Sequence, residues 1–409
     1  MDEILDEFYG AFPYPWRPMR FDVLADPTFH SQFLCQDLGD YHGDRFPGVR
    51  SVWVAGCGTN QALITALRFP QAAVLGTDAS ARSLEICAEN AASVGVTNLI
   101  LEREGIADAT HHDRFDYVVC TGVIHHNPDP EKCLARLASA LRPRGVLELM
   151  VYNAFHRLAP AAFQAAMRVF EGAASGRRAQ ADRLDLARRL AAAVPGGSVL
   201  AADLSGDDSP SAEAWADTWI NPCEHGYTVD ELWVMAQDCG LHLETPTPSR
   251  FGEVAGSAGS LGWSLDLRDA DLRERYEALD DRARWQTANL LLHDRSPMLW
   301  FYLTPTAAGP RVSEAGRAEA FLSTAFRRNR TERHGFVLHG SGAYRKVSRA
   351  TPFPVGQPSA EVLSVHDAAD GRRPMREVFH ELGLECDAGT ANRIRLQLTT
   401  SAHPFLLAR

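Results

Sequence analysis

The sequence predicts an α/β fold in which helices cover both faces of a doubly wound, mostly parallel sheet. Three observations lead to this prediction. Between residues 51 and 152, short apolar runs alternate with longer helical patterns, as they do in β–α–β units with a buried parallel sheet. Two glycines follow the first apolar run, in VWVAGCGTNQAL at 52–63. Asp78 ends the second run, at the sheet edge where parallel folds bind their ligands.

The expected elements of this core follow one another closely. Strands are expected at 52–56, 72–78, 98–102, 115–122 and 145–153, and helices at 60–69, 80–95 and 130–141. Helices of this length can serve as crossover connections between parallel strands, because such connections need a dozen or more residues.

The segments around the core have different patterns. Residues 10–21, GAFPYPWRPMRF, contain three prolines, which fix φ and restrict the preceding residue, so an extended chain is expected. Amphipathic helices are expected at 155–172 and 179–194, with a loop at 195–211. Because no strand separates them, residues 154–222 are predicted to form a helical lid insertion.

The core is expected to resume after the insertion. Thr228 is a suitable N-cap for the next helix and Gly240 a suitable stop. Strands are then expected at 241–246 and 298–305, with a helix at 271–292 between them.

The last hundred residues differ from the rest in charge. Residues 306–409 hold 15 Lys and Arg and 10 Asp and Glu, although the whole chain has a net charge of −11. Seven basic residues lie between Arg327 and Arg349, as a solvated face or as a docking surface for an acidic partner. A helix at 371–383 and an alternating strand at 392–400 predict a small C-terminal α+β module, of winged-helix-like type.

We therefore expect three parts in the chain. They are an extended and helical N-terminal cap at 1–50, a core at 51–305, and a C-terminal accessory domain at 311–409, which follows a linker at 305–310.

Composition disfavours several classes of protein. The chain has 409 residues, of which 45% are hydrophobic and 23% charged, as in soluble proteins. No apolar run reaches the roughly 18 residues of a membrane span, and the acidic N-terminus lacks a signal-peptide pattern, so a cytoplasmic protein without a membrane partner is expected. The negative net charge makes nucleic acid an unfavourable partner. The eight cysteines form no CxxC pair, and no metal site is expected.

The glycine motif narrows the choice of ligand. A dinucleotide-binding loop has the pattern G-x-G-x-x-G, but here Gly56 and Gly58 are followed by Gln61 at the third position. The sequence also lacks the phosphate-binding motif G-x-x-x-x-G-K-[ST]. Asp78 stands twenty residues after Gly58, where a carboxylate can accept hydrogen bonds from ribose. The pattern predicts a nucleoside ligand without a diphosphate and disfavours a nicotinamide dehydrogenase.

Three segments carry a resemblance to a known family. VWVAGCGTN, VLGTDAS and FDYVVCTGVIHHNPDPEKCLARLASALRPRGVLELMVYN together resemble the class I S-adenosylmethionine-dependent methyltransferases, which have a Rossmann-like fold. DTWINPCEHGYTVDELWVMAQDCGL at 217–241 and PYP at 13–15 are similar to bacterial methyltransferases that often occur fused to tetratricopeptide repeats.

The resemblance implies S-adenosylmethionine as cofactor, S-adenosylhomocysteine as product, and a set of cofactor-binding residues. The expected residues are Ala55, Gly56, Cys57 and Gly58 beneath the methionine part, Asp78 at the ribose, Ala79 and Ile106 at the adenine, Thr121 and Gly122 near the sulfonium, and Tyr14, with Trp16, as a lid. The family often has an acidic residue that accepts from the adenine amino group. Here Gly105 occupies that position, and Glu104 or Asp108 is the expected substitute.

Candidate catalytic residues follow the fourth and fifth strands. His125 and His126 titrate near neutral pH and could act as a general base, or could cap the following turn. Adjacent side chains on an extended segment diverge, so the pair is not expected to bind metal. Tyr152 is a third catalytic candidate and Asn153 a substrate contact, both at the pocket rim, and a cap at the strand end is their alternative role. By resemblance, Glu224, His225 and Tyr227 lie over the substrate pocket, and helix capping is their alternative role.

Three functions remain open from the sequence. The first is a methyltransferase that acts on O, N or C of a small or medium-sized metabolite. The second is a methyltransferase of proteins or peptides that uses the basic C-terminal domain for docking. The third is a regulatory pseudoenzyme that binds the cofactor without turnover, which the intact glycine loop and Asp78 disfavour.

Overall fold

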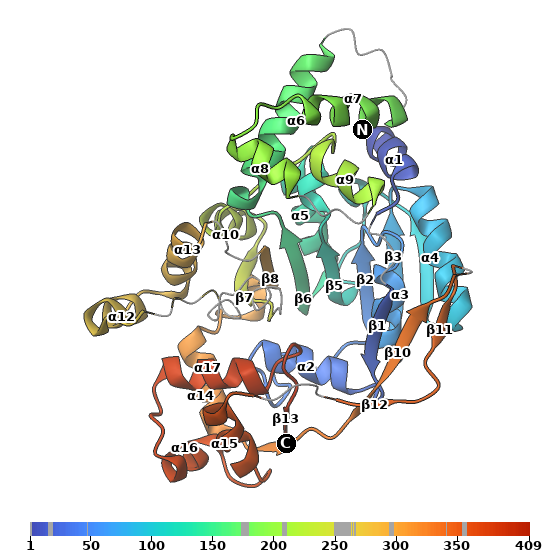
Figure 1. Cartoon of the computed structure of the whole chain (residues 1–409). Coiled ribbons are helices and arrows are strands. Elements are labelled where there is room, and N and C mark those ends of the chain that lie inside the picture. The colour runs from blue at the N-terminus through green and yellow to red at the C-terminus, as the bar shows by residue number, and fades with distance from the viewer. Residues whose placement is uncertain are drawn as a thin grey trace.

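The centre of the molecule is a seven-stranded sheet with the order β4-β3-β2-β5-β6-β8-β7 (Figure 1). The computed structural model describes residues 2–14, 19–46, 48–172, 180–206, 211–248, 263, 265, 267–293, 298–340, 342–353 and 358–409. The strands are β2 (Ser51–Ala55), β3 (Ala73–Asp78), β4 (Leu99–Arg103), β5 (Phe115–Thr121), β6 (Leu141–Val151), β7 (Leu241–Pro246) and β8 (Leu299–Pro305). The first five are parallel, and β8 is antiparallel to both β6 and β7. The predicted α/β fold with a mostly parallel sheet is confirmed.

Each face of the sheet packs against its own layer of helices. Side chains alternate along β2, so that Val52 and Val54 belong to one buried cluster and Trp53 and Ala55 to the other. The first cluster includes side chains of α2 (Phe29–Asp37), α3 (Gln61–Arg68) and α4 (Ala81–Val94). The second includes side chains of α5 (Pro130–Ala140), α10 (Val229–Asp238) and α13 (Asp281–Leu291). The sheet is therefore doubly wound, as the continuous apolar strands predicted.

A separate group of helices stands above the carboxyl ends of the parallel strands (Figure 1). We call this group the roof. It comprises α1 (Asp2–Ala11), α6 (Leu158–Glu171), α7 (Gln180–Ala192), α8 (Val199–Ser205) and α9 (Ala212–Trp219). Phe8 of α1 and Phe12, which follows the helix, share a buried cluster with Phe163 and Trp219. The helical lid insertion is thus present, and the N-terminal helix packs into it.

Three local predictions in these segments are wrong. The loop expected at 195–211 contains α8, whose N-cap Ser198 accepts from the backbone N–H of Ala201 at 3.1 Å. The single helix expected at 271–292 is two helices, α12 (Ala270–Glu277) and α13, because Asp280 caps a new start. Residues 10 and 11, expected to be extended, belong to α1.

The C-terminal part builds a helical cluster at the opposite end of the sheet from the roof (Figure 1). It contains α14 (Glu314–Ser323), α15 (Ala360–Ala368), α16 (Met375–Leu382) and α17 (Ala388–Leu398). The strand expected at 392–400 is wrong, because most of it lies in α17. The buried residues Ala391, Ile394 and Leu398 recur at the three- and four-residue spacing of a helix, which outweighs the local alternation. The helix-then-strand order that favoured a winged-helix-like module is therefore absent there.

The N-terminal segment is shared between both ends of the molecule. Its helix α1 joins the roof, whereas β1 (Arg20–Leu24) pairs antiparallel with β10 (Glu332–Leu338) of the C-terminal part. The short strands β11 (Tyr344–Lys346) and β12 (Thr351–Pro352) also pair with β10, and β9 (Phe326–Arg328) pairs with β13 (Leu406–Ala408). None of the helices within the described ranges is long and apolar enough to cross a membrane.

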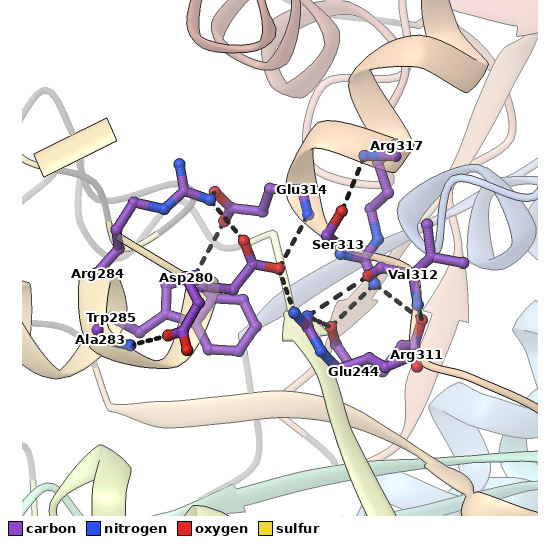
Figure 2. Close-up of polar contacts among 12 residues, drawn as sticks. Glu244, Asp280, Ala283, Arg284, Trp285, Arg311, Val312, Ser313, Glu314 and Arg317 are labelled. Atoms are coloured by element: carbon purple, nitrogen blue, oxygen red, sulfur yellow. Dashed lines mark hydrogen bonds and ion pairs between the residues drawn. The ribbon is translucent and has the colours of Figure 1, made fainter. Parts of the chain in front are cut away.

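Buried ion pairs join the C-terminal helices to the sheet (Figure 2). Glu244 on β7 and Arg317 on α14 are both fully buried, and their charged groups lie 2.9 Å apart. Arg45 contacts the same carboxylate at 3.2 Å. Arg311 joins Asp281 of α13, and Glu314 lies 2.7 Å from Arg284. Residues 311–409 are therefore bonded to the core instead of hanging from a free linker.

Candidate active site

The glycine loop after β2 forms a backbone cradle. Gly56 and Gly58 have φ values of +69° and +51°, a conformation that side chains disfavour. A Cβ on Gly56 would also lie 2.4 Å from Cγ1 of Val123. Between them, Cys57 is fully buried and its N–H donates to the Thr77 carbonyl at 2.8 Å. The loop is thus fixed in a shape that only glycine at these positions allows.

Asp78 stands beside this loop at the end of β3. Its Oδ2 accepts from the Gly58 N–H and its Oδ1 from the Ser80 N–H, each at 2.8 Å. Burial raises the pKa of the Asp78 carboxyl, and these two hydrogen bonds partly oppose the shift. Each carboxylate oxygen has more than one acceptor site, so both keep capacity for a ligand's hydroxyl groups.

The opposite wall of the cradle comes from the end of β5. Gly122 has a φ of +79°, and Thr121 is half-buried. The Gln61 amide donates to the Thr121 hydroxyl, which joins the start of α3 to the end of β5. Gln61 therefore has a structural task at the place where a dinucleotide-binding loop has its third glycine. Ala55, at the end of β2, is fully buried beneath this wall.

The residues expected at the adenine lie next to Asp78. Ala79 is half-buried, its carbonyl accepts from Arg103 at 3.0 Å, and Ile106 is buried in a short 3₁₀ helix, η1 (Ile106–Asp108). The carboxylate of Glu104 contacts His111 at 3.0 Å.

His111 packs edge-on against Trp53, at 4.8 Å between ring centroids. The Asp108 side chain is 70% exposed. Glu104 is thus already engaged by His111 and Asp108 is exposed to solvent. Neither of these expected substitutes is a buried carboxylate that is available to the adenine.

Helix α1 lies over the loop that follows β3. The Asp6 carboxylate accepts from the Ala81 N–H at 3.3 Å and pairs with Arg103 at 3.0 Å. Tyr14, just beyond α1, is half-buried. Burial raises the pKa of its hydroxyl, and the Asp217 charge adds to the shift. Trp16, the other expected lid residue, lies outside the described residues.

The two histidines after β5 have different surroundings. They belong to a 3₁₀ turn, η2 (Ile124–His126). His126 Nδ1 lies 2.9 Å from the Cys223 carbonyl, whereas neither ring nitrogen of His125 has a partner in the described part of the chain. The His125 ring packs against Tyr152 at 3.9 Å. Burial lowers the pKa of His125 well below its ordinary value, and the nearby His126 and Arg157 add to this.

The segment 223–227 runs beside the ends of β5 and β6. The His225 N–H donates to the His125 carbonyl at 2.8 Å, and the Tyr227 N–H donates to the Tyr152 carbonyl at 2.9 Å. The side chain of His225 is half-buried, and Tyr227 is packed into the core under α10. The structure therefore brings His125, His126, Tyr152 and this segment together.

Two of the expected substrate contacts make structural bonds instead of facing an open pocket. Glu224 forms a bidentate ion pair with Arg157, with both N–O distances at 2.6 Å. Asn153 is fully buried, and its side chain caps η3 (Ala154–Arg157) by accepting from the Phe155 N–H. Thr228 forms a capping box with Glu231 at the start of α10, which confirms the predicted N-cap.

Sequence reasoning missed the residues that the roof contributes. Asp217 of α9 is 4% exposed. Its Oδ1 accepts from the Tyr9 hydroxyl at 3.3 Å and from the Asn221 amide at 3.2 Å, and its Oδ2 accepts from the Tyr152 hydroxyl at 3.4 Å. The Arg157 guanidinium lies 4.3 Å above the Tyr152 ring. The sequence holds one sign of this role, because the other buried residues of the same helix, Ala214, Ala216 and Trp219, are apolar.

Comparisons with known proteins agree with this geometry. Residues 53–147 match a family model described as a methyltransferase domain. An uncharacterised protein from Synechococcus sp. is 25% identical over 310 residues, which are 71% of this chain and 68% of that relative. Trans-aconitate 2-methyltransferase from Deinococcus radiodurans is 39% identical over 108 residues, which are 25% of this chain and 40% of that enzyme.

A solved structure has a similar fold. The structure of PKMT2 from Rickettsia typhi in complex with AdoHcy (S-adenosylhomocysteine) has a TM-score of 0.57 and 13% sequence identity, and the match covers 90% of this chain and 74% of that chain. Residues 53–147 therefore match a methyltransferase domain, and the chain shares the Rossmann-like fold of this structure.

Proposed function

We propose that this chain is an enzyme that transfers a methyl group from S-adenosylmethionine to an O, N or C atom of a small or medium-sized metabolite. The observation that carries the proposal is the glycine cradle with Asp78 at its side. Gly58 donates to Asp78, and both carboxylate oxygens keep acceptor capacity for the two ribose hydroxyls. The positive φ of Gly56 and Gly58 lets the methionine part approach the backbone. The residues present therefore fit the cofactor.

The protein's own work in such a reaction is alignment and exclusion of water. When bound, S-adenosylmethionine supplies a methyl group that is already activated on a sulfonium. The roof supports this assignment, because its helices stand above the strand ends (Figure 1) and Asp6 of α1 bonds to the loop after β3. Enclosure of this kind orients an acceptor and keeps water from the reacting atoms.

His126 is the proposed general base for an acceptor that must lose a proton. Its Nδ1 faces the Cys223 carbonyl at 2.9 Å, and a carbonyl only accepts, so the neutral ring carries its hydrogen on Nδ1. Nε2 then has the lone pair that a base needs. His125 and Tyr152 pack beside it, and we assign them the tasks of holding the ring and shaping the acceptor side.

A small acceptor is favoured over a protein substrate by the position of the basic residues. Strands β9, β10 and β11 carry five of the seven basic residues, and β10 and β11 lie away from the roof (Figure 1). Arg333 is in addition paired with Asp22 at 3.0 Å. Arg345 and Lys346 are exposed and remain the best probes of a docking role for this surface.

The proposal is tested with the purified full chain, methyl-labelled S-adenosylmethionine and an extract of the source cells. Label in small molecules supports it. Label in macromolecules that is lost in the double variant Arg345→Glu, Lys346→Glu would instead establish the protein or peptide alternative. Cofactor binding with S-adenosylhomocysteine formation no higher than in a blank would establish the regulatory pseudoenzyme.

A further inference from the structure

Asp217 has a buried carboxyl group that no cation contacts directly in the part of the chain that the structure describes. It is 4% exposed, and its three hydrogen-bond donors are two hydroxyls and an amide, from Tyr9, Tyr152 and Asn221. Arg157 is nearby, but it is already engaged by Glu224 through two bonds of 2.6 Å. A buried carboxylate without a counter-ion is costly, so a site of this kind would suit a positively charged ligand.

The groups around Asp217 do not supply the missing charge. Burial raises the pKa of Tyr9, Tyr14 and Tyr152, and the charge of Asp217 adds to each shift, so their hydroxyls stay protonated and neutral. Burial lowers the pKa of His125, so its ring is neutral as well. Because Arg157 and Glu224 cancel one another, the described residues around Asp217 leave one carboxylate without a paired cation.

The contacts of Asp217 place its carboxylate on the side of the site where the methyl acceptor would bind. It bonds to Tyr152, the residue that follows β6, and to Tyr9 on the helix that covers the loop after β3. Tyr152 in turn packs against His125 at the end of β5. Asp217, on α9 of the roof, therefore connects the roof to the strand ends through Tyr152 and Tyr9.

We propose that the methyl acceptor is an amine, and that Asp217 binds it as an ammonium ion among the rings and hydroxyls of Tyr9, Tyr14 and Tyr152. This inference rests on the proposed function and narrows its substrate class. Aromatic faces and a desolvated carboxylate both attract cations. A carboxylate acceptor, in contrast, would be repelled by Asp217.

The same carboxylate favours the chemical step for an amine. His126 takes one proton from the ammonium, and the nitrogen lone pair then forms a bond to the methyl carbon. The bond from that carbon to sulfur breaks, and its electron pair remains on sulfur. The product is a methylammonium ion, so positive charge moves onto nitrogen beside Asp217. Compared with the neutral amine that attacks, the transition state has partial positive charge on nitrogen, and the carboxylate stabilises that charge.

The test compares two cofactor analogues that differ at the methyl position. S-adenosylhomocysteine has a neutral sulfur there, whereas sinefungin has a carbon that bears a primary amine. Calorimetry on the full chain is expected to give tighter binding of sinefungin. Asp217→Asn is expected to weaken sinefungin binding at least about tenfold, as loss of a close charge pair does, and to change S-adenosylhomocysteine binding less than about twofold. The matched control Asp203→Asn, at an exposed roof position on α8, should leave both affinities unchanged.

The other possible results show whether the amine proposal or the proposed function is wrong. Sinefungin that binds the wild type no more tightly than S-adenosylhomocysteine overturns the amine proposal, and this readout does not depend on the folding of any variant. The same holds if Asp217→Asn leaves the affinity for sinefungin unchanged. In both cases binding of S-adenosylhomocysteine leaves the proposed function intact. Failure of the wild type to bind either analogue would overturn the proposed function itself.

Discussion

Replacement of Asp78 by alanine is expected to weaken binding of S-adenosylhomocysteine about 5- to 150-fold. The carboxylate has two tasks in the structure. It accepts backbone N–H groups from Gly58 and Ser80, each at 2.8 Å, and in the proposed complex it also accepts from the ribose. Alanine removes both sets of hydrogen bonds at once, so the glycine loop loses its anchor and the ribose loses its acceptor.

The magnitude follows from the cost of an unpaired buried donor. A buried donor that loses its partner costs about 1–3 kcal/mol, and every 1.4 kcal/mol is tenfold in a dissociation constant. The range therefore corresponds to a loss of about 5- to 150-fold. The value should lie toward the upper end, because the variant removes two backbone hydrogen bonds of 2.8 Å in addition to the ribose contact.

The assay is titration calorimetry on the full chain, with Asp116→Ala as the matched variant. Asp116 also accepts from two backbone N–H groups, those of Arg50 at 3.0 Å and Ser51 at 2.9 Å. It lies at the amino end of β5, far from the carboxyl ends of the strands where Asp78 stands. Both variants lose stability, whereas only Asp78→Ala should lose affinity. An unchanged affinity for S-adenosylhomocysteine in Asp78→Ala would refute the ribose assignment. If both variants lost affinity equally, the cause would be general destabilisation of the fold.

Three further predictions concern the proposed general base His126, the buried ion pair of Glu244 and Arg317, and the pH dependence of stability. His126→Ala should lower the turnover number about 10²- to 10⁴-fold at unchanged S-adenosylhomocysteine affinity, and near-normal turnover would remove the base assignment. Glu244→Ala leaves the Arg317 guanidinium buried without its ion-pair partner and should lower the free energy of unfolding in urea by about 3–5 kcal/mol. A loss below about 1 kcal/mol would show that this ion pair does not hold the C-terminal helices to the sheet. Burial raises the pKa of Asp37 to about 7, above the ordinary value of about 3.9 in the unfolded chain. The folded state therefore holds this proton more tightly, and stability should fall as the pH rises from about 4 to 7. Asp37→Asn should remove that decline, and a slope equal to that of the wild type would contradict it.

Much of the core could be predicted because its signals are local. Side chains that alternate along Val52–Ala55 pack on opposite faces of the sheet, as period-two alternation requires. The left-handed backbone at Gly56 and Gly58 is a property that only those residues bring at low cost. The place of Asp78 at a strand end follows from the strand itself, since all parallel strands end at one edge.

The C-terminal part shows where local pattern is insufficient. Residues 392–400 alternate as a strand does, yet most of them lie in α17. Burial of Ala391, Ile394 and Leu398 against the other C-terminal helices decided the outcome. Segments that read equally well as strand or helix are decided by the surface against which they pack.

The sequence by itself determined the α/β core, the glycine cradle and its aspartate, because each depends on neighbours a few residues away. Only the tertiary structure placed Asp217 against Tyr9, which is 208 positions distant, and against Tyr152. The same holds for Arg157 and Glu224. Such contacts depend on how the roof packs above the sheet, and no local pattern encodes that packing. The acceptor side of the site, and with it the inference of an amine substrate, therefore came from the fold.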